Sequence, residues 1–325
     1  MLVRKQISCN EKKEDSTHLR NRFLRKLWPP SYYWYYRRWH KDVFYLAKRL
    51  HAEVGFDLTH QLTMVGFREP GYLWKLNIPF VWGPVGGMGL YPWRFLISLG
   101  LNGALYSLSY NLLNLMHMNF FTRPRKAARA AGSGLFVATP ENKYGAMYYW
   151  GCSSTVVPEV GLPRKPKERV SERKEEDPLR LVWSGQHKPG KALQFALEAL
   201  RQLPRDINWK FDILGIGPKS AEWKKLAECF GIKDRCCFHG WLPREEALYV
   251  MSNGHLLLIT SLRDLTSTVI VEALALGLPV LTLDHCGFAH VIDETCGIKV
   301  PVTSPKRVTK DIADSIEKLA RDEDF

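Results

Sequence analysis

The sequence lacks the cysteine patterns of a protein that is stabilised by disulfides or by a structural metal ion. Its seven cysteines include no Cys-x-x-Cys pair and no spacing typical of metal ligands, and their number is odd. Several lie in apolar segments that we predict to be strands. We therefore interpret the cysteines as buried thiols of a reducing compartment and expect no metal site. The adjacent Cys236 and Cys237 fit strand packing better than redox chemistry.

Long uninterrupted apolar runs are also missing. Met1 to Asp15 is polar and charged, unlike a secretory signal. Four asparagines and a histidine interrupt the most apolar stretch, residues 95–121: Asn102, Asn111, Asn114, His117 and Asn119. A membrane-spanning helix tolerates such residues poorly, so we expect an amphipathic or core helix there and a cytoplasmic protein.

Acidic residues are scarce in the first half. Residues 1–170 hold 25 Lys and Arg against 10 Asp and Glu, whereas residues 171–325 hold 21 against 23. A basic half predicts a polyanionic surface as its partner, either nucleic acid or anionic lipid. The chain has no nucleic-acid-binding motif, so we expect no nucleic acid partner and favour peripheral contact with the inner face of a membrane.

One segment divides the chain. Residues 162–178 contain eleven charged residues and three prolines among 17, which cannot form a core and predicts a charged linker. The expected organisation is an N-terminal domain over residues 1–161, this linker, and a C-terminal domain over residues 179–325. A chain of 325 residues is long enough for two such cores.

The C-terminal half alternates short apolar runs with helical patterns. We predict strands at 179–185, 209–215, 235–240, 255–260, 279–284 and 297–300, and helices at 191–203, 220–231, 243–252, 266–276 and 308–321. The strand runs lack polar alternation, as expected where both faces of a sheet are covered. The pattern predicts an α/β fold with a doubly wound parallel sheet.

The N-terminal half is less regular. We predict helices at 31–54, 70–76, 93–121 and 142–151, and strands at 56–63, 80–83, 134–139 and 155–159. No internal repeat is present.

Residues 261–280 combine groups suited to a phosphate and a sugar. An apolar strand runs into a polar loop, a helix follows, and the helix ends at Gly277 before Pro279. Thr266, Ser267 and Thr268 fall at the predicted helix start, where unpaired N–H groups suit a phosphate. The carboxylates of Asp264 and Glu272, eight residues apart, can accept hydrogen bonds from sugar hydroxyls. The segment indicates a nucleotide-sugar ligand.

This segment resembles the acidic motif of retaining glycosyltransferases of the GT-B fold, family four. That family usually places Glu where this chain has Asp264, then seven residues, Glu, and a Gly-x-Pro-Val ending. The resemblance is specific over residues 179–300 and looser back to about residue 40. It implies two Rossmann-like domains, of which the N-terminal one is incomplete, in a chain truncated at both ends.

The resemblance also implies a donor site in the C-terminal domain. Gly185 and Lys191 match the turn that holds the donor diphosphate, although Gln186 stands where the family has Arg. A neighbouring His187 or Lys188 could compensate, and a solvated turn is the alternative. Gly215 and Gly217 match a Gly-x-Gly-Pro turn, and Trp241 lies within residues 238–243, which match the segment whose backbone reads the base.

Within the acidic motif, the resemblance assigns Glu272 to the nucleotide ribose and Asp264 to the donor sugar and its phosphate. A helix N-cap near Leu265 is the alternative for Asp264. No metal or other cofactor is implied.

In the N-terminal domain, His60 matches a family histidine that contacts the transferred sugar, but Leu62 replaces the second histidine of that pattern. A hydrogen-bonded core histidine is the alternative for His60. Gly86 and Gly87 lie in a turn similar to an acceptor-side loop, with a plain tight turn as the alternative.

These features predict a retaining glycosyltransferase. It would move a sugar from a nucleotide-diphosphate sugar to a saccharide or lipid-linked acceptor, in surface polysaccharide or glycolipid synthesis. An inactive paralogue that binds a nucleotide or a partner without turnover is the first alternative, favoured by Gln186, Asp264 and Leu62. A nucleotide-sugar epimerase, which shares the fold, is the second.

Overall fold

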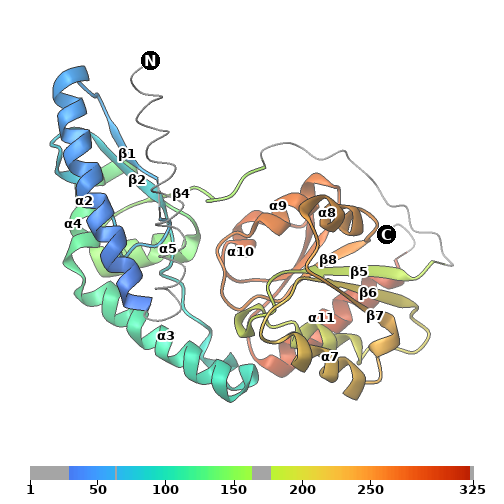
Figure 1. The fold of residues 1–325 in the computed structure, drawn as a ribbon. Helices are drawn as coiled ribbons and strands as arrows, with labels where there is room; N and C mark the ends of the chain where they lie inside the picture. The colour runs from blue at the N-terminus through green and yellow to red at the C-terminus, as the bar shows by residue number, and fades with distance from the viewer. Residues whose placement is uncertain (1–28, 63, 163–176, 323–325) are drawn as a thin grey trace.

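The computed structural model describes residues 29–62, 64–162 and 177–322, which form two α/β units, each around its own parallel sheet (Figure 1). Most of the predicted linker lies outside the described residues. Among the described residues, no helix has both the length and the apolar character needed to cross a bilayer.

The first sheet has four parallel strands in the order β1-β2-β3-β4. They are β1 (Thr59–Gln61), β2 (Phe80–Val85), β3 (Leu135–Val137) and β4 (Thr155–Val156). All four predicted strands of this half are present. Three are shorter than predicted, whereas β2 continues two residues further, into the Gly-rich turn.

The helices of this half are α2 (Pro29–Val54), α3 (Gly100–Phe120), α4 (Thr122–Ala131) and α5 (Pro140–Gly145), the last continued by a π-helical turn, Ala146–Trp150. Short 3-10 turns cover Leu73–Lys75, Trp93–Phe95, Ile97–Leu99 and Gly132–Gly134.

Two helix predictions in this half were wrong in extent. Residues 70–76 form only one 3-10 turn, because Gly71 and Asn77 on either side have left-handed φ angles of 66° and 55°. The stretch 93–121 is not one helix, because Gly100, at a φ of 74°, separates α3 from the preceding 3-10 turns.

The second sheet has six parallel strands in the order β10-β9-β8-β5-β6-β7. Its strands are β5 (Leu179–Ser184), β6 (Trp209–Leu214), β7 (Cys236–Gly240), β8 (Leu256–Ile259), β9 (Val280–Leu283) and β10 (Gly297–Val300). From β5 the chain adds β6 and β7 on one side, then returns to add β8, β9 and β10 on the other. The predicted doubly wound sheet is confirmed, and its switch point lies between β5 and β8.

Helices cover both faces of this sheet. They are α6 (Gln194–Leu200), α7 (Ser220–Cys229), α8 (Arg244–Ser252), α9 (Thr268–Ala275), α10 (Phe288–Val291) and α11 (Pro305–Ala320). Figure 1 shows α8 and α9 on one side of the sheet and α7 and α11 on the other.

Two of these helices begin later than predicted. The helix α6 starts at Gln194 instead of residue 191, because Ala192 has a φ of 48°. The helix α9 starts at Thr268 instead of residue 266, because Ser267 has a φ of 71°.

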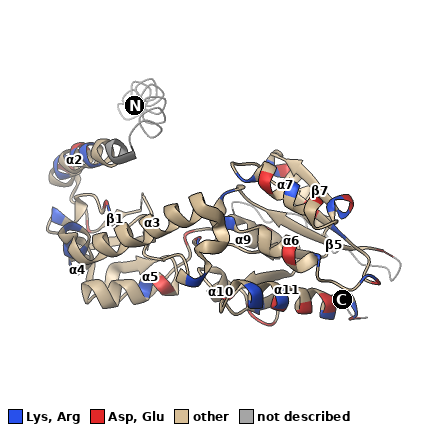
Figure 2. Ribbon diagram, turned by 90° about the horizontal axis from the view of Figure 1, so that it is seen from below, with Lys and Arg blue, Asp and Glu red and all other residues tan. Residues whose placement is uncertain are grey.

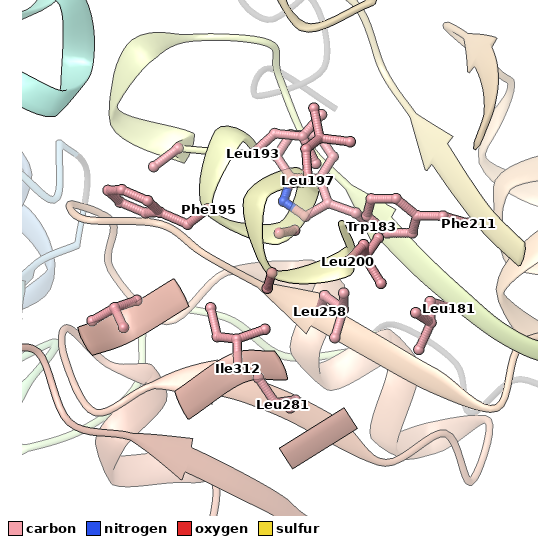
Figure 3. Packing of buried hydrophobic residues seen from close by; sticks show 14 of the residues in the cluster. Leu181, Trp183, Leu193, Phe195, Leu197, Leu200, Phe211, Leu258, Leu281 and Ile312 are labelled. Atoms are coloured by element: carbon pink, nitrogen blue, oxygen red, sulfur yellow. The ribbon is translucent and has the colours of Figure 1, made fainter. Parts of the chain in front are cut away.

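Large apolar side chains fill the space between the sheet and α6, α7 and α11 (Figure 3). Trp183 and Phe211 project from the strands toward Leu197 of α6, and all three are at most 2% exposed. Phe95 of the N-terminal half joins this core, with its ring centroid 5.7 Å from that of Phe195. The two units therefore share packing as well as a chain connection.

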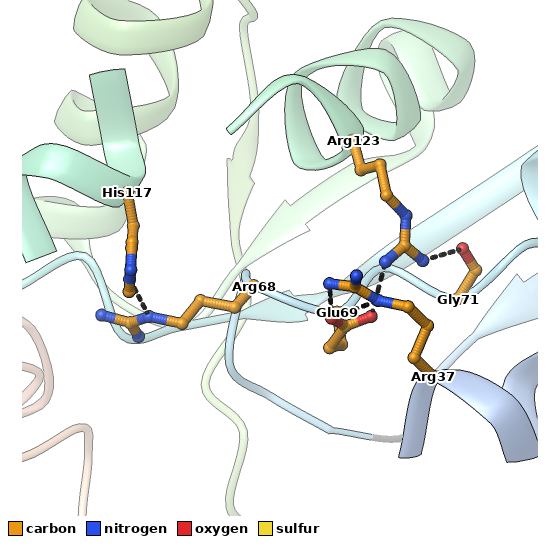
Figure 4. Close-up of polar contacts among 6 residues, drawn as sticks. All are labelled: Arg37, Arg68, Glu69, Gly71, His117 and Arg123. Atoms are coloured by element: carbon orange, nitrogen blue, oxygen red, sulfur yellow. Dashed lines mark hydrogen bonds and ion pairs between the residues drawn. The ribbon is translucent and has the colours of Figure 1, made fainter. Parts of the chain in front are cut away.

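A buried carboxylate ties α2 and α4 to the first unit (Figure 4). Glu69 is 1% exposed at its side chain and accepts hydrogen bonds from Arg37 Nε at 3.0 Å and Arg123 Nη1 at 2.8 Å. The guanidinium groups of Arg37 and Arg123, 86 positions apart in sequence, thus compensate the negative charge of the buried Glu69 carboxylate.

His40, on α2, should make the first unit sensitive to acid. It is 2% exposed, and its burial, opposed by the charge of Glu69 and assisted by that of Arg123, lowers its pKa to about 4. In the unfolded chain the imidazole of His40 binds a proton near pH 6.5, whereas in the folded protein it stays neutral down to about pH 4. Acid therefore favours unfolding between about pH 6.5 and pH 4. At pH 4.5 we expect a loss of about 2 kcal/mol relative to pH 7 from this group.

Thermal unfolding followed from pH 7 to pH 4.5 measures the effect of His40. A His40→Gln variant, which cannot bind the proton, should show a flatter pH dependence of Tm. Equal slopes for the two proteins would contradict the assignment.

Candidate active site

Several of the predicted donor residues lie at the carboxyl ends of β5 and β8. These strands flank the switch point, where loops diverge and open sheets of this kind bind ligands. Lys191, after β5, donates a hydrogen bond from Nζ to Asp264 Oδ2, after β8, and each side chain is 24% exposed. A backbone bond from Leu262 N to Gly190 O (2.9 Å) joins the two loops.

Asp264 is not an N-cap, because α9 begins four residues after it. Its Oδ1 accepts only the Leu265 N–H, at 3.0 Å, and its own N–H points to Cys286 Sγ at 3.2 Å. The carboxylate therefore stays directed at Lys191.

The glycines after β5 and β6 permit close contact between two turns. A Cβ on Gly215 would lie 1.9 Å from Gly185 O, and one on Gly217 would lie 2.6 Å from His187 O. This close packing explains why glycine is required at positions 215 and 217. The contact of Gly215 and Gly217 with a ligand stays a prediction.

Neither residue suggested to replace the missing Arg is clearly placed to do so. His187 is 1% exposed, its Nδ1 lies 2.9 Å from Ser220 Oγ, and its ring packs against Trp183 and Trp223. Compensation by His187 was therefore a wrong expectation. Gln186 and Lys188 are exposed beside it.

A carboxylate already lies at the start of α9. Glu159, three residues after β4, accepts hydrogen bonds from Thr266 N at 2.8 Å and Thr266 Oγ1 at 3.1 Å. Thr266 is 1% exposed, while Ser267 and Thr268 are more accessible. The amide that was predicted to meet a phosphate thus binds an anionic group of the other unit.

A cavity of about 230 Å³ lies between the two units. Its lining comes from both: Val65, Gly66, Gly87, Gly89, Glu141, Asn142, Arg263, Asp264 and Leu265. The guanidinium of Arg263 lies 3.8 Å from the ring centroid of Tyr110 on α3 and donates to the Tyr110 hydroxyl. The cavity therefore holds a fixed cation beside Asp264.

Glu141, at the start of α5, crosses to the loop after β9. It accepts a hydrogen bond from Cys286 N at 3.0 Å and lies 2.9 Å from His285 Nδ1. Burial opposes ionisation of Glu141, but bonding to His285 and Cys286 N outweighs it and lowers its pKa. Burial likewise opposes protonation of His285, but Cys286 and Glu141 outweigh it and raise its pKa. The pair is an ion pair between the units.

Glu272 lies apart from the cavity lining. Its side chain is 15% exposed and accepts a hydrogen bond from Arg244 Nε, at the start of α8, at 2.9 Å. Trp241 is 70% exposed in the loop before α8. Both residues flank the loop after β7, where the base and ribose were predicted.

The predicted residues of the N-terminal unit divide into two groups. Gly87 lines the cavity, and a Cβ on Gly86 would lie 2.8 Å from Leu265, so this turn does approach the β8 loop. His60 is exposed on β1, is absent from the cavity lining, and lies 2.9 Å from Gly83 O through Nε2. The core-histidine alternative is wrong, since His60 is exposed, and its sugar contact stays a prediction.

Sequence reasoning missed Glu141, Glu159 and Arg263. A signal for the first two was present, because they are the only acidic residues between positions 70 and 162. Isolated carboxylates in a basic segment often have a fixed partner. Arg263 directly precedes Asp264 and carried no signal of its own.

Two groups of side chains in the described residues have donors close enough to hold a metal ion. They are Glu141, His285 and Cys286 between the units, and Asp212, Cys237 and His239 on β6 and β7. In both, the imidazole already has a carboxylate partner within 2.9 Å. The expectation of no metal stays a prediction.

Known proteins resemble this chain in sequence and in fold. The family of glycosyl transferases group 1 matches residues 164–325. The chain is 32% identical over 109 residues to the lipopolysaccharide glucosyltransferase WaaG of Escherichia coli (strain K12), covering 33% of this chain and 29% of that protein. It is 29% identical over 144 residues to the alpha-D-kanosaminyltransferase of Streptomyces kanamyceticus, covering 44% and 36%. The aligned part spans about a third of these relatives.

Solved structures extend the likeness to both units. The lipopolysaccharide outer core galactosyltransferase WaaB superposes with a TM-score of 0.62 at 15% identity, covering 87% of this chain and 71% of that one. A sucrose-phosphate synthase from Thermosynechococcus elongatus gives a TM-score of 0.56 at 18% identity, covering 84% and 69%. The chain therefore belongs, through residues 164–325, to the glycosyl transferases group 1 family and has the GT-B fold.

Proposed function

We propose that the protein is a retaining glycosyltransferase that transfers a sugar from a nucleotide-diphosphate sugar. The observation that carries the proposal is the pairing of Lys191 with Asp264 at the switch point of the six-stranded sheet, beside the start of α9. A cation, a carboxylate and helix-start amides in one place suit a diphosphate joined to a sugar. A similar fold from Anabaena, HepE, was solved in complex with UDP and has a TM-score of 0.53.

In the proposed reaction the incoming hydroxyl and the leaving diphosphate share one face of the sugar. The hydroxyl oxygen bonds to the anomeric carbon as the bond from that carbon to the diphosphate oxygen breaks, and the leaving phosphate takes the hydroxyl proton. No covalent sugar–protein intermediate forms, so neither a protein nucleophile nor a protein base is needed. Lys191 and the amides at Thr266, Ser267 and Thr268 would stabilise the negative charge that develops on the diphosphate. Asp264 would orient the sugar hydroxyls, and the acceptor would enter the cavity beside Gly87 and Arg263.

The proposed acceptor is a saccharide or lipid-linked molecule of surface polysaccharide or glycolipid synthesis. Support comes from relatives whose names include a lipopolysaccharide glucosyltransferase and a putative colanic acid biosynthesis glycosyltransferase. The basic first half would hold the protein on an anionic membrane, with Lys and Arg gathered on α2 and α4 (Figure 2).

Internal partners occupy three of the proposed donor-binding groups. Lys191 binds Asp264, Glu272 binds Arg244, and the Thr266 amide binds Glu159. A donor must replace at least the Glu159 contact to place a phosphate at that amide. Glu159 therefore competes with the phosphate for one hydrogen bond and repels it electrostatically.

Replacing Glu159 with glutamine should tighten nucleoside diphosphate binding. The amide side chain keeps the size of glutamate but removes the negative charge, so we expect a Kd lower by about threefold to tenfold. Isothermal titration with UDP, GDP and ADP measures the change. Glu222→Gln, an exposed carboxylate on α7, is the control and should leave the Kd unchanged. Weaker binding by Glu159→Gln would refute the competition.

A thermal-shift screen against nucleotide-diphosphate sugars, followed by transfer assays with the best donor, tests the function. A donor should raise Tm, because it binds only the folded protein. Binding without transfer or donor hydrolysis would favour the inactive paralogue. Conversion of the donor to an epimer without acceptor would favour an epimerase. No shift with any donor would contradict the proposed function.

A further inference from the structure

The helix α3 is amphipathic in the reverse of the usual sense. Its buried positions are Gly103, Ser107, Asn111, Asn114 and Met118. Most of its exposed positions carry large apolar side chains. A surface helix normally turns its apolar face toward the core. Here that face points away from the protein.

The buried polar side chains have specific partners. Asn111 accepts a hydrogen bond from Tyr91 N and donates one to Tyr91 O, both at 2.9 Å. Asn114 donates to Gly87 O at 3.0 Å and accepts from Arg68. These contacts fix the rotation of α3 about its axis, so its apolar face cannot turn inward.

The exposed face is a continuous stripe. Along α3 it runs at helical spacing through Leu101, Leu105, Leu108, Leu112, Met116 and Phe120, and Ile97 is exposed in the 3-10 turn just before Gly100. Ile97 is 89% exposed, Leu101 78% and Phe120 76%. Tyr106 and Trp93, 60% and 49% exposed, add aromatic rings suited to a membrane interface. A contiguous apolar surface of this length marks an interaction site.

The charges around the stripe select its partner. Residues 70–140 contain no Asp or Glu but six basic residues, and α3 itself has no charged residue. In Figure 2, α3 is uncoloured along its length, while Lys and Arg gather on α4, which follows it directly. A protein partner would ordinarily meet charges of both signs at a rim. An uncharged apolar stripe next to an excess of cations matches an anionic bilayer, whose surface is negative and whose interior is apolar.

The two units differ in the same way. Of the 26 large apolar side chains that are exposed in the described residues, 23 lie at or before Val157. The other three are Ile216, Trp241 and Tyr249. Most of the exposed apolar surface thus lies on the unit with the basic excess.

We propose that α3 lies flat on an anionic lipid bilayer, with its outer face from Leu101 to Phe120, and Ile97 of the turn before it, inserted among the lipid headgroups. The cations at Lys126 and Arg129, both exposed on α4, contact the anionic headgroups. The inference deepens the proposed function, on which it rests for its purpose, because it names the surface that brings a lipid-linked acceptor to the cavity between the units. Tyr110 of α3, which contacts Arg263, connects the two sites.

Sedimentation with vesicles of equal parts phosphatidylglycerol and phosphatidylcholine tests the proposal. A Leu101→Glu/Leu112→Glu variant should lower the vesicle partition coefficient by about tenfold or more, because two side chains lose their apolar burial. Tyr249→Glu, 62% exposed on α8, is the matched control and should bind like the unmodified protein. A Lys126→Gln/Arg129→Gln variant should bind these vesicles severalfold more weakly, because it loses attraction to anionic lipid. The unmodified protein should likewise bind severalfold more weakly to vesicles of phosphatidylcholine alone.

Equal vesicle binding by the α3 variant and the unmodified protein would overturn the proposal. So would a dimer in sedimentation equilibrium that the α3 variant dissociates, because a second copy would then cover the stripe. The nucleotide thermal shift, measured without lipid, separates this inference from the proposed function. If that shift persists while vesicles fail to bind, only the membrane surface is wrong; if vesicles bind without any shift, only the donor site is wrong.

Discussion

Replacing Lys191 with alanine is expected to weaken nucleoside diphosphate binding by about tenfold to a hundredfold. A charge-assisted hydrogen bond contributes about 1.5–3 kcal/mol, and 1.4 kcal/mol corresponds to a factor of ten. The substitution also removes the ammonium group that pairs with Asp264, so the uncompensated carboxylate of Asp264 repels the incoming diphosphate. Isothermal titration with UDP, GDP and ADP at fixed ionic strength measures the effect.

The matched control is Lys210→Ala, an exposed lysine on β6. It removes the same charge from the same unit and should change the Kd by less than about twofold, since exposed charges are screened by salt. Tm of both variants should stay near that of the unmodified protein, because Lys191 and Asp264 are an accessible pair. An intact Kd in Lys191→Ala would remove the donor site from this position.

Replacing Glu69 with alanine is expected to cause the largest loss of stability in the first unit. The substitution leaves Arg123, 25% exposed, and Arg37, 45% exposed, without their shared carboxylate. Breaking a buried ion pair from one side costs about 3–5 kcal/mol. Arg37 can regain water, so we expect about 3 kcal/mol, visible as a lower urea midpoint of the transition that includes α2.

Glu222→Ala is the comparison, because its pair with Lys219 is a surface contact with a carboxylate side chain 61% exposed. It should change the free energy of unfolding by less than about 1 kcal/mol. Similar midpoints for Glu69→Ala and the unmodified protein would show that the Glu69 cluster does not hold α2 in place.

The alternation of apolar runs and helical patterns was sufficient to predict the six-stranded sheet. The central strands β8 and β9 are buried at every position and therefore on both faces, and such apolar runs are visible in sequence. Helix starts were less predictable. Ser267 and Ala192 adopt left-handed φ angles that their side chains do not favour, so local sequence gave no reason to delay α9 and α6.

The contacts between the two units could not be predicted from local sequence patterns. Glu159 meets Thr266 across 107 positions and Glu141 meets Cys286 across 145. The spacing of motifs along the chain can place residues at the ends of neighbouring strands, as with Lys191 after β5 and Asp264 after β8. It does not say which carboxylate of another unit reaches them. The reversed polarity of α3 was hidden for the same reason, because its composition alone fits a core helix equally well.

A structure of the protein with a bound nucleotide-diphosphate sugar tests the central claim most directly. The account predicts the diphosphate between Lys191 and the start of α9, with Glu159 displaced from Thr266 and the nucleoside near Glu272 and Trp241. A donor bound elsewhere, or a diphosphate that leaves the Lys191–Asp264 pair and the Glu159 contact untouched, would contradict it.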